Sequence, residues 1–215
     1  MFHRLLSWLW PLSASRVDGH FGPLEVRWEN GRKVLNSEHG NQSFGSLHRV
    51  WRCTLDQLDL RKDPPRSMLL LGLGGGSAIE IIRDELGIKC PITAVELDPA
   101  MLAVAREQFA LDRHADLDVV LGDAMIQVHG LRTRFDLVLV DLFDDLDLAR
   151  GVDSRAFMHG LRECCAAEGV VCINTVAYDE RSNTRCEVVR QHATTVFHDV
   201  HEIQLEEVNR MFILR

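Results

Sequence analysis

The chain has 215 residues, of which 46% are hydrophobic and 26% are charged. A chain of this size can bury one sizeable core, and its composition excludes wholesale disorder. Its formal net charge of −8 argues against a general nucleic-acid-binding protein, which carries a basic surplus, and is compatible with a cationic small-molecule ligand.

The six cysteines form no C-x-x-C pair, and Cys90 and Cys172 lie in or beside apolar runs. We therefore expect reduced packing residues of a cytoplasmic protein, with neither a disulfide framework nor a metal site. No segment approaches the ~20 apolar residues that span a bilayer. The apolar residues 1–12 lack the cleavage site of a signal peptide. We expect them to form a strand or helix docked on the same chain or on a dimer partner, with a short interfacial helix as the alternative.

The first part of the chain predicts a small β element followed by a helix. Residues 24–28 alternate apolar and polar side chains, Asn30-Gly31 is a turn signal, and residues 33–35 run back, which together indicate a hairpin. Residues 46–60 have helical periodicity. Pro64 and Pro65 cannot continue a helix. We therefore expect an N-terminal unit over residues 1–63 and a larger domain over residues 64–215.

After the two prolines, short apolar runs alternate with segments of helical periodicity. The predicted strands are residues 67–73, 92–95, 117–121, 135–140, 170–173, 200–205 and 210–214. The predicted helices are residues 78–86, a segment starting at Pro99, residues 154–166 and residues 187–197. Repeated β-α units force a parallel sheet, and the last two strands add an antiparallel hairpin. The sequence therefore predicts an α/β fold with a Rossmann-like seven-stranded sheet.

The first strand of this domain leads directly into a glycine-rich turn, formed by Gly72, Leu73, Gly74, Gly75 and Gly76. In a doubly wound sheet this turn faces the crevice at the carboxyl ends of the strands, where ligands bind. Glycine there permits positive φ and lets a ligand approach the backbone closely. We take the four glycines as cofactor-binding residues, with a tight turn that binds nothing as the alternative.

Acidic residues follow the next two strands. Glu96 ends the second strand at the place, about twenty residues past the loop, where a carboxylate accepts hydrogen bonds from ribose hydroxyls. Asp98 precedes Pro99 and is expected to cap a helix. Asp123, in Gly122-Asp123-Ala124, has two open interpretations: an acceptor for an exocyclic amino group such as adenine N6, or another helix cap.

Asp141 ends the fourth strand, and Asp144 and Asp145 follow closely. An acid at this edge is costly to desolvate unless it serves a cation or a hydrogen-bond donor. It can hold an amine nucleophile, take its proton and favour a cationic sulfonium donor, so Asp141 with Asp144 are the candidate catalytic residues. An acidic surface loop suits Asp145 and Asp147 better. A nicotinamide-dependent enzyme is less favoured, because the loop is G-x-G-G-G and no hydride-transfer acid stands out.

Taken in order, the glycine loop, residues 95–99, residues 122–124 and residues 136–141 resemble the spermidine synthase family. Residues 141–144, Phe157 and residues 168–174 are similar to its bacterial spermidine synthase-like branch, as are residues 22–27 and 31–43. The resemblance implies the Rossmann-like sheet of S-adenosylmethionine (SAM) methyltransferases and spermidine synthases. The roles that it implies are nucleoside binding by Gln42, ribose binding by Glu96, adenine binding by Asp123 with Ala124, and binding of the alkylated amine by Asp141.

The chain departs from this family at the end of the glycine loop. Aminopropyltransferases carry G-G-G-D-G-G, whose aspartate binds the amine tail of the donor, and Ser77 resembles that position here. Without the aspartate, the chain lacks a negative charge that attracts the amine tail of decarboxylated SAM. A helix N-terminus with a serine can instead bind the carboxylate of SAM. His48 is the nearest match to the family's Tyr-His-Glu segment, and without its tyrosine we assign it no role.

We therefore predict a transferase that uses SAM or decarboxylated SAM as co-substrate, without a metal, and alkylates a small-molecule amine. Aminopropyl transfer is the first hypothesis, SAM-dependent methyl transfer the second, and a non-catalytic nucleoside-binding homologue the third. We also expect a cytoplasmic homodimer without a nucleic-acid partner or stable membrane insertion.

Overall fold

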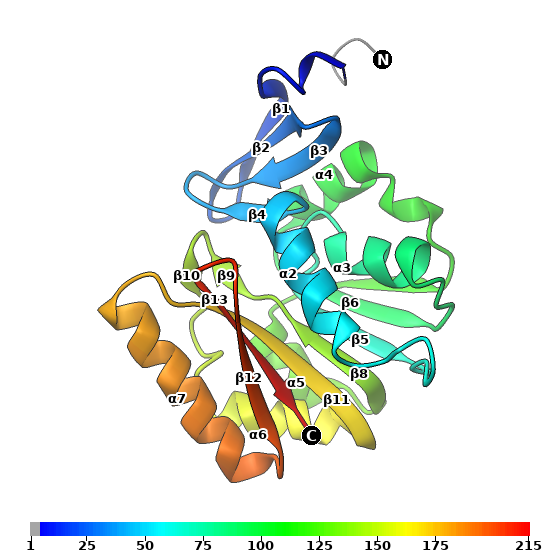
Figure 1. Ribbon diagram of the computed structural model, residues 1–215. Helices are drawn as coiled ribbons and strands as arrows, with labels where there is room; N and C mark the ends of the chain where they lie inside the picture. The colour runs from blue at the N-terminus through cyan, green and yellow to red at the C-terminus, as the bar shows by residue number, and fades with distance from the viewer. Residues whose placement is uncertain (1–4) are drawn as a thin grey trace.

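The computed structural model describes residues 5–215, in which a small N-terminal sheet lies beside a larger sheet that has helices on both faces (Figure 1). The N-terminal sheet is antiparallel and consists of β1 (Leu12–Gly19), β2 (Gly22–Glu29), β3 (Arg32–Asn36) and β4 (Asn41–Ser43). Asn30 and Gly31, with φ of 48° and 78°, turn β2 into β3. The predicted hairpin is therefore confirmed.

The larger sheet has the strand order β12-β13-β11-β8-β5-β6-β7. Its strands are β5 (Met68–Leu71), β6 (Ile92–Glu96), β7 (Leu117–Leu121), β8 (Phe135–Val140), β11 (Cys165–Val176), β12 (Val200–Leu205) and β13 (Asn209–Leu214). The pairs from β7 across to β11 are parallel, while β13 runs antiparallel to both β11 and β12. The predicted α/β fold with a seven-stranded Rossmann-like sheet is confirmed.

Each face of the larger sheet is covered by its own set of helices. One face carries α2 (Gly45–Asp56), α3 (Ser77–Glu80) with its π-helical continuation η1 (Ile81–Glu85), and α4 (Pro99–Phe109). The other face carries α5 (Ala124–Gly130), α6 (Arg155–Cys164) and α7 (Glu180–Val196). In β5, Met68 and Leu70 join the first apolar cluster, and Leu69 and Leu71 join the second. Burial on both faces explains why this strand is apolar at every position.

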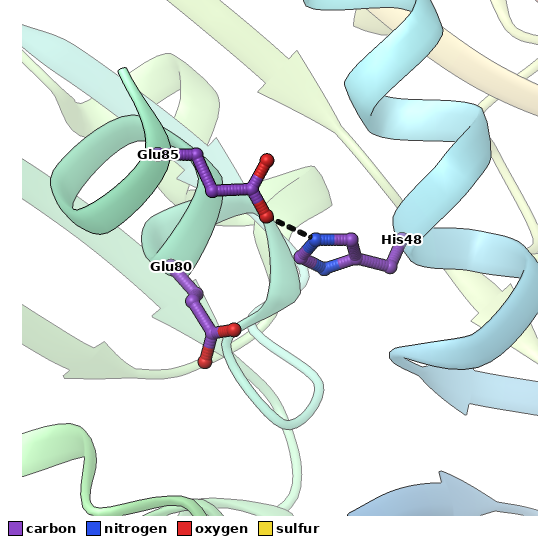
Figure 2. A group of neighbouring side chains, drawn as sticks. All are labelled: His48, Glu80 and Glu85. Carbon is purple, nitrogen blue, oxygen red and sulfur yellow. Dashed lines mark hydrogen bonds and ion pairs between the residues drawn. The ribbon is translucent and has the colours of Figure 1, made fainter. Parts of the chain in front are cut away.

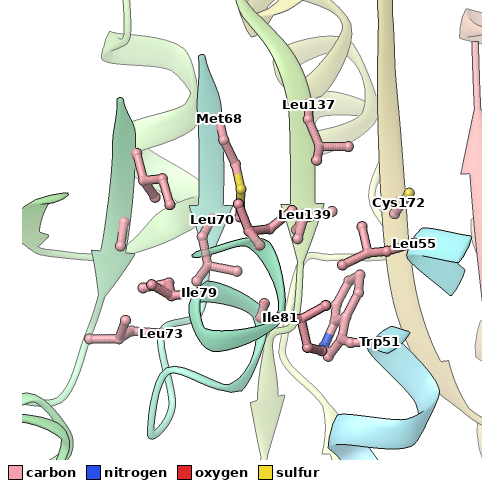
Figure 3. Packing of buried hydrophobic residues seen from close by; sticks show 14 of the residues in the cluster. Trp51, Leu55, Met68, Leu70, Leu73, Ile79, Ile81, Leu137, Leu139 and Cys172 are labelled. Carbon is pink, nitrogen blue, oxygen red and sulfur yellow. The ribbon is translucent and has the colours of Figure 1, made fainter. Parts of the chain in front are cut away.

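Helix α2 precedes the expected boundary at residue 63, yet it packs on the larger sheet. Its Trp51 and Leu55 belong to the same buried cluster as Leu139 of β8 (Figure 3). At its polar side, Nε2 of His48 hydrogen-bonds Oε1 of Glu85 at 2.6 Å (Figure 2). Helix α2 therefore belongs to the core of the larger sheet, whereas Leu24, Val26 and Leu35 of the N-terminal sheet form a separate cluster with α4.

Several elements were not predicted, for reasons visible in their composition. Helix α7 begins at Glu180, seven residues before the predicted start, because Asp179 and Ser182 form a capping box ahead of polar turns that carry no apolar period. The short helix α5 is capped by a single side-chain hydrogen bond, from the backbone N–H of Met125 to Asp123. The other unpredicted elements are β1, β4, a 3-10 turn η2 (Leu111–Arg113), and a two-stranded hairpin of β9 (Phe143–Asp144) and β10 (Asp147–Leu148).

The apolar N-terminal segment is attached to the β2–β3 turn and presents large side chains to the surface. Ser7 accepts a hydrogen bond from the backbone N–H of Gly31 at 2.9 Å, whereas Leu9 and Trp10 are 83% and 75% exposed. The part of the predicted segment before Leu5 lies outside the described residues. Within residues 5–215, no helix has the length and apolarity needed to cross a membrane.

Gly72 gives a direct test of the packing between β5 and β8. Its φ is +90°, and a Cβ added there would lie 2.0 Å from the backbone oxygen of Asp141. We expect Gly72→Ala to lower the free energy of unfolding by at least about 2 kcal/mol, measured by urea denaturation. Gly130→Ala is the control, because a Cβ there meets no atom within 4 Å. Equal stability of the two variants would contradict this close approach.

Candidate functional site

A cavity of about 410 Å³ opens at the carboxyl ends of β5, β6, β7 and β8, with the β3–β4 loop and the β9–β10 hairpin among its walls. Its volume lies in the range of small-molecule sites, roughly 300–1,000 Å³. Eight of the predicted site residues line it: Gln42, Gly72, Gly74, Glu96, Asp123, Ala124, Asp141 and Asp144. The sequence therefore located the edge of the sheet at which the cavity forms.

Glu96 holds the glycine loop in place from the end of β6. Its Oε2 accepts hydrogen bonds from the backbone N–H groups of Leu73 at 3.0 Å and Gly74 at 3.3 Å, and its Oε1 accepts from Asp98 at 2.9 Å. Burial raises the pKa of Glu96, and these three donors offset part of that shift. A carboxylate has about four acceptor positions, so roughly one is left for a ligand hydroxyl.

The second half of the glycine loop faces the protein instead of the cavity. Gly75 donates its N–H to Oγ of Ser43 at 2.9 Å, and a Cβ on Gly76 would lie 3.2 Å from Leu111. The hydroxyl of Ser77 accepts from the backbone N–H of Phe44 at 2.6 Å, and Ser77 is buried. Gly75, Gly76 and Ser77 are absent from the cavity lining, and they join the loop to β4 and the start of α2.

Asp123 fulfils the cap interpretation and still lines the cavity. Its Oδ1 accepts from the backbone N–H of Met125 at 2.8 Å, which fixes the start of α5. Its Oδ2 has no partner within residues 5–215. One carboxylate can therefore cap the helix with one oxygen and accept from a ligand amino group with the other.

Asp141 is held by side-chain donors from two other elements. The indole Nε1 of Trp51 donates to Oδ2 at 2.8 Å, and Nδ2 of Asn174 donates to Oδ1 at 2.9 Å. Asn174 is itself fixed by Nδ2 of Asn209, which donates to its Oδ1 at 3.0 Å. Burial raises the pKa of Asp141 to about 6, against the two hydrogen bonds that lower it. The group is therefore poised to exchange a proton close to neutral pH.

Asp144 and Asp145 lie on the β9–β10 hairpin, and their environments differ. Burial raises the pKa of Asp144, an effect that the nearby guanidinium of Arg185 partly offsets. Burial also acts on Asp145, but hydrogen bonds from Ser37 and His39 outweigh it and leave the pKa of Asp145 below its ordinary value. Asp145, interpreted from sequence as a surface acid, ties the hairpin to the β3–β4 loop.

Gln42 reinforces this connection between the N-terminal sheet and the hairpin. Its Nε2 donates to Oγ of Ser37 at 3.0 Å and to the backbone oxygen of Asp145 at 3.0 Å. Gln42 is the middle residue of β4 and lines the cavity. It also connects the loops around that cavity.

The cavity is strongly acidic. Its ionisable lining residues are Glu96, Asp98, Asp123, Asp141, Asp144, Asp145, Arg150 and His20. Six carboxyl groups face one guanidinium and one imidazole, so a ligand with positive charge is favoured over an anion. This charge pattern is local and more specific than the net charge of the chain.

Sequence reasoning missed Trp51, Asn174 and Asn209. Trp51 was counted as one of the apolar residues of its helix, which is correct for its ring, since the residue is 0% exposed. Asn174 follows the apolar run of β11, and a polar residue at that strand end was a usable signal of the same kind as Asp141. Asn209 comes from the terminal hairpin, and nothing in its local sequence points to the cavity.

Among residues 5–215, His48, Glu80 and Glu85 are placed so that one atom from each could hold a metal ion (Figure 2). Arg52 already pairs with Glu85 at 3.0 Å, and Arg113 pairs with Glu80 at 3.3 Å. A cation would have to displace both guanidinium groups. The cluster is therefore best described as a salt-bridge network that joins α2 to the α3–η1 helix.

The fold and the cavity define the class: a Rossmann-like α/β protein of the SAM methyltransferase and spermidine synthase type. The spermine/spermidine synthase domain matches residues 58–205, and the chain belongs to this family. The resemblance predicted from the sequence is confirmed, and the family is one of transferases.

Two curated relatives show how the family divides. The chain is 32% identical over 157 residues to an eEF1A lysine and N-terminal methyltransferase homolog of Drosophila pseudoobscura pseudoobscura, covering 68% of this chain and 23% of that protein. It is 32% identical over 123 residues to a polyamine aminopropyltransferase of Chromobacterium violaceum, covering 57% of this chain and 47% of that protein. The chain thus spans less than half the length of these relatives.

Solved structures show the same fold. Human methyltransferase-like protein 13 in complex with SAH superposes with a TM-score of 0.66 at 24% identity, over 80% of this chain and 82% of that chain. Spermidine synthase from Thermotoga maritima superposes with a TM-score of 0.72 at 11% identity, over 94% of this chain and 72% of that chain.

Glu96→Gln tests the contact between β6 and the glycine loop. The amide would place an N–H group against backbone N–H donors, so we expect a loss of about 1–3 kcal/mol in the free energy of unfolding by urea denaturation. Asp123→Asn is the matched control, because asparagine caps a helix as well as aspartate, and we expect a change under about 0.5 kcal/mol. Equal effects of the two substitutions would show that Glu96 does not support the loop.

Proposed function

We propose that this protein binds an adenosyl sulfonium compound in the acidic cavity and transfers an alkyl group from it to an amine. The observation that carries the proposal is Asp141, a carboxylate that two side-chain donors hold at the cavity wall. In this proposal, Glu96 accepts from the ribose, Asp123 with Ala124 contacts the adenine, and Gln42, Gly72 and Gly74 border the nucleoside. Gly75 and Gly76 support the loop on the side that faces away from the cavity.

The chemistry follows from the charges. An uncharged amine nitrogen attacks the carbon next to the sulfonium, a C–N bond forms, and the C–S bond breaks with its electron pair passing to sulfur. The sulfur leaves as a neutral thioether, and the alkylated nitrogen gains a positive charge and then loses a proton. Asp141 accepts a hydrogen bond from the amine and takes up that proton, and Asp144 adds a second negative charge beside the acceptor.

Aminopropyl transfer from decarboxylated SAM is the first candidate. The donor's tail then carries only positive charge, which suits six lining carboxyl groups. The serine that could have donated a hydrogen bond to a donor carboxylate, Ser77, is buried and lies outside the cavity lining. This arrangement supports a donor without a carboxylate.

Methyl transfer from intact SAM is the second candidate, and Arg150 favours it. Arg150 lines the cavity, and a guanidinium can hold a carboxylate through two parallel hydrogen bonds. In both candidates the acceptor is an amine, and the same carboxylate receives its proton.

Three further expectations belong to this proposal. We expect a place in polyamine metabolism if the donor is decarboxylated SAM, a cytoplasmic location, and a homodimer. The exposed side chains of Leu9 and Trp10 support self-association, because large apolar surfaces favour contact with a partner.

Isothermal calorimetry with SAM, decarboxylated SAM and methylthioadenosine tests the proposal. Tighter binding of decarboxylated SAM supports aminopropyl transfer, and tighter binding of SAM supports methyl transfer. Nucleoside binding without turnover of any amine would identify a non-catalytic homologue. Absence of binding to all three compounds would overturn the proposal.

The proton role of Asp141 predicts a pH dependence. The pKa of Asp141 is about 6, so the carboxylate is ionised above that pH and takes up a proton below it. We expect kcat/KM to fall about tenfold per pH unit below about pH 6. Asp141→Asn should abolish turnover while nucleoside affinity stays within about tenfold.

Asp147→Asn is the control for Asp141→Asn, because Asp147 lies six residues further along the chain, on β10, and outside the cavity lining. We expect it to leave turnover within about twofold. Normal turnover of the Asp141 variant, or a wild-type pH profile that is flat through pH 6, would refute the assignment.

A further inference from the structure

We propose that Asn209 and Asn174 form an amide relay that sets the orientation and ionisation of Asp141, so that the C-terminal hairpin acts as a positioning element for the transfer reaction. This inference rests on the proposed function for its consequence in catalysis. Its geometry stands on three hydrogen bonds that join β13, β11, the end of β8 and α2.

The direction of the relay is fixed by the chemistry of its members. An asparagine side chain donates through Nδ2 and accepts through Oδ1. Nδ2 of Asn209 donates to Oδ1 of Asn174 at 3.0 Å, so the Nδ2 end of Asn174 turns toward Oδ1 of Asp141, at 2.9 Å. An amide rotated by half a turn would place two oxygen atoms against each other at Asp141.

The other oxygen of Asp141 faces a group that can only donate. Nε1 of the Trp51 indole lies 2.8 Å from Oδ2, and this nitrogen has no acceptor function. Trp51 and Asn174 are 0% and 1% exposed, so water does not replace them as partners. Each carboxylate oxygen thus receives one N–H group, which favours the ionised form. The acceptor positions that remain are the ones available to an amine in the cavity.

The pairing of β11 with β13 explains how the relay is assembled. Val176 pairs with Asn209 and Asn174 pairs with Met211, so Asn209 enters from the start of β13 beside the end of β11. Both asparagines line the cavity next to Asp141. The first residue of β13 therefore contributes to the site, because it binds the Oδ1 end of Asn174 and so holds the Nδ2 end at Asp141.

The two hydrogen-bond donors of Asp141 are uncharged side chains. The other ionisable groups around the same cavity are Glu96, Asp98, Asp123, Asp144, Asp145, Arg150 and His20. Burial raises the pKa of Asp141, and the hydrogen bonds from Trp51 and Asn174 lower it. A change in amide orientation should therefore be visible directly in the titration of this residue.

Two variants of Asn209 test the relay. In Asn209→Asp an ionised aspartate accepts and cannot donate, so it competes with Asp141 for the Nδ2 end of Asn174, and its charge also disfavours ionisation of Asp141. We expect the pKa of Asp141 to rise by about one pH unit or more, a tenfold change in the ratio of ionised to protonated form. Asn209→Ala is the decisive variant, because it removes the hydrogen bond to Asn174 without adding a charge, and we expect a smaller rise in the same direction.

The readout is a 13C NMR titration of side-chain carboxyl carbons, with the Asp141 signal identified by its loss in Asp141→Asn. It needs neither donor nor acceptor. Asn183→Asp adds the same charge at an exposed position of α7 and should leave the Asp141 titration unchanged. Far-UV circular dichroism and the melting temperature establish that each variant is folded, and Asn209→Ala carries the test if Asn209→Asp does not fold.

The outcomes separate the relay from the proposed function. A raised pKa in Asn209→Ala together with a matching alkaline shift of the acid limb of kcat/KM supports both. A raised pKa in Asn209→Ala in a protein that alkylates no amine supports the relay and contradicts the proposed function. An Asp141 titration that stays within about 0.2 pH units of wild type in folded Asn209→Ala overturns the relay, whatever the activity and whatever Asn209→Asp shows.

Discussion

The carboxylate of Glu96 receives hydrogen bonds from the backbone N–H groups of Leu73 and Gly74, and this contact joins the end of β6 to the turn that follows β5. The same turn packs closely against the end of β8. The backbone oxygen of Asp141 lies so near Gly72 that no side chain fits at position 72. Three strand ends are therefore held in register around one space. The cavity depends on this arrangement, since Gly72, Gly74, Glu96 and Asp141 all line it.

The carboxylates of Glu96 and Asp141 have different hydrogen-bond partners, and this difference corresponds to different roles in our proposal. Glu96 is bound mainly by backbone groups, which makes it part of the framework and leaves it about one acceptor position for a ligand. Asp141 is bound by side chains from α2 and β11, and its pKa of about 6 allows it to gain and lose a proton under mild conditions. In our proposal the first carboxylate places the nucleoside, and the second receives the proton of the amine.

Most of the fold was predictable because the residues within and beside each element determine its type and its ends. The alternation around Asn30-Gly31 and the apolar run of β5 each predicted the observed element. Helix α7 was predicted too short, since its first turns are fixed by the polar pair Asp179 and Ser182 and not by an apolar face. The short hairpin β9–β10 was not predicted, because it is held by hydrogen bonds to Ser37 and Gln42, which lie far away in the sequence.

The site was predictable to the level of the sheet edge and not beyond it. An acidic residue at a strand end, such as Asp141, can be recognised from the sequence. Its hydrogen-bond partners depend on tertiary packing, and Trp51 lies 90 positions earlier in the chain. The glycine loop shows the opposite limit. Four glycines look equivalent in sequence, yet Gly72 and Gly74 line the cavity while Gly75 and Gly76 pack against the protein. Side-chain direction after a tight turn is set by backbone dihedrals that the residue type alone does not specify.

A crystal structure of the protein with methylthioadenosine tests the central claim most directly. Our account predicts the ribose hydroxyls within about 3 Å of Glu96, the adenine amino group beside Asp123, and the sulfur directed toward Asp141. A nucleoside bound outside this cavity, or bound in it with the sulfur turned away from Asp141, would contradict the account.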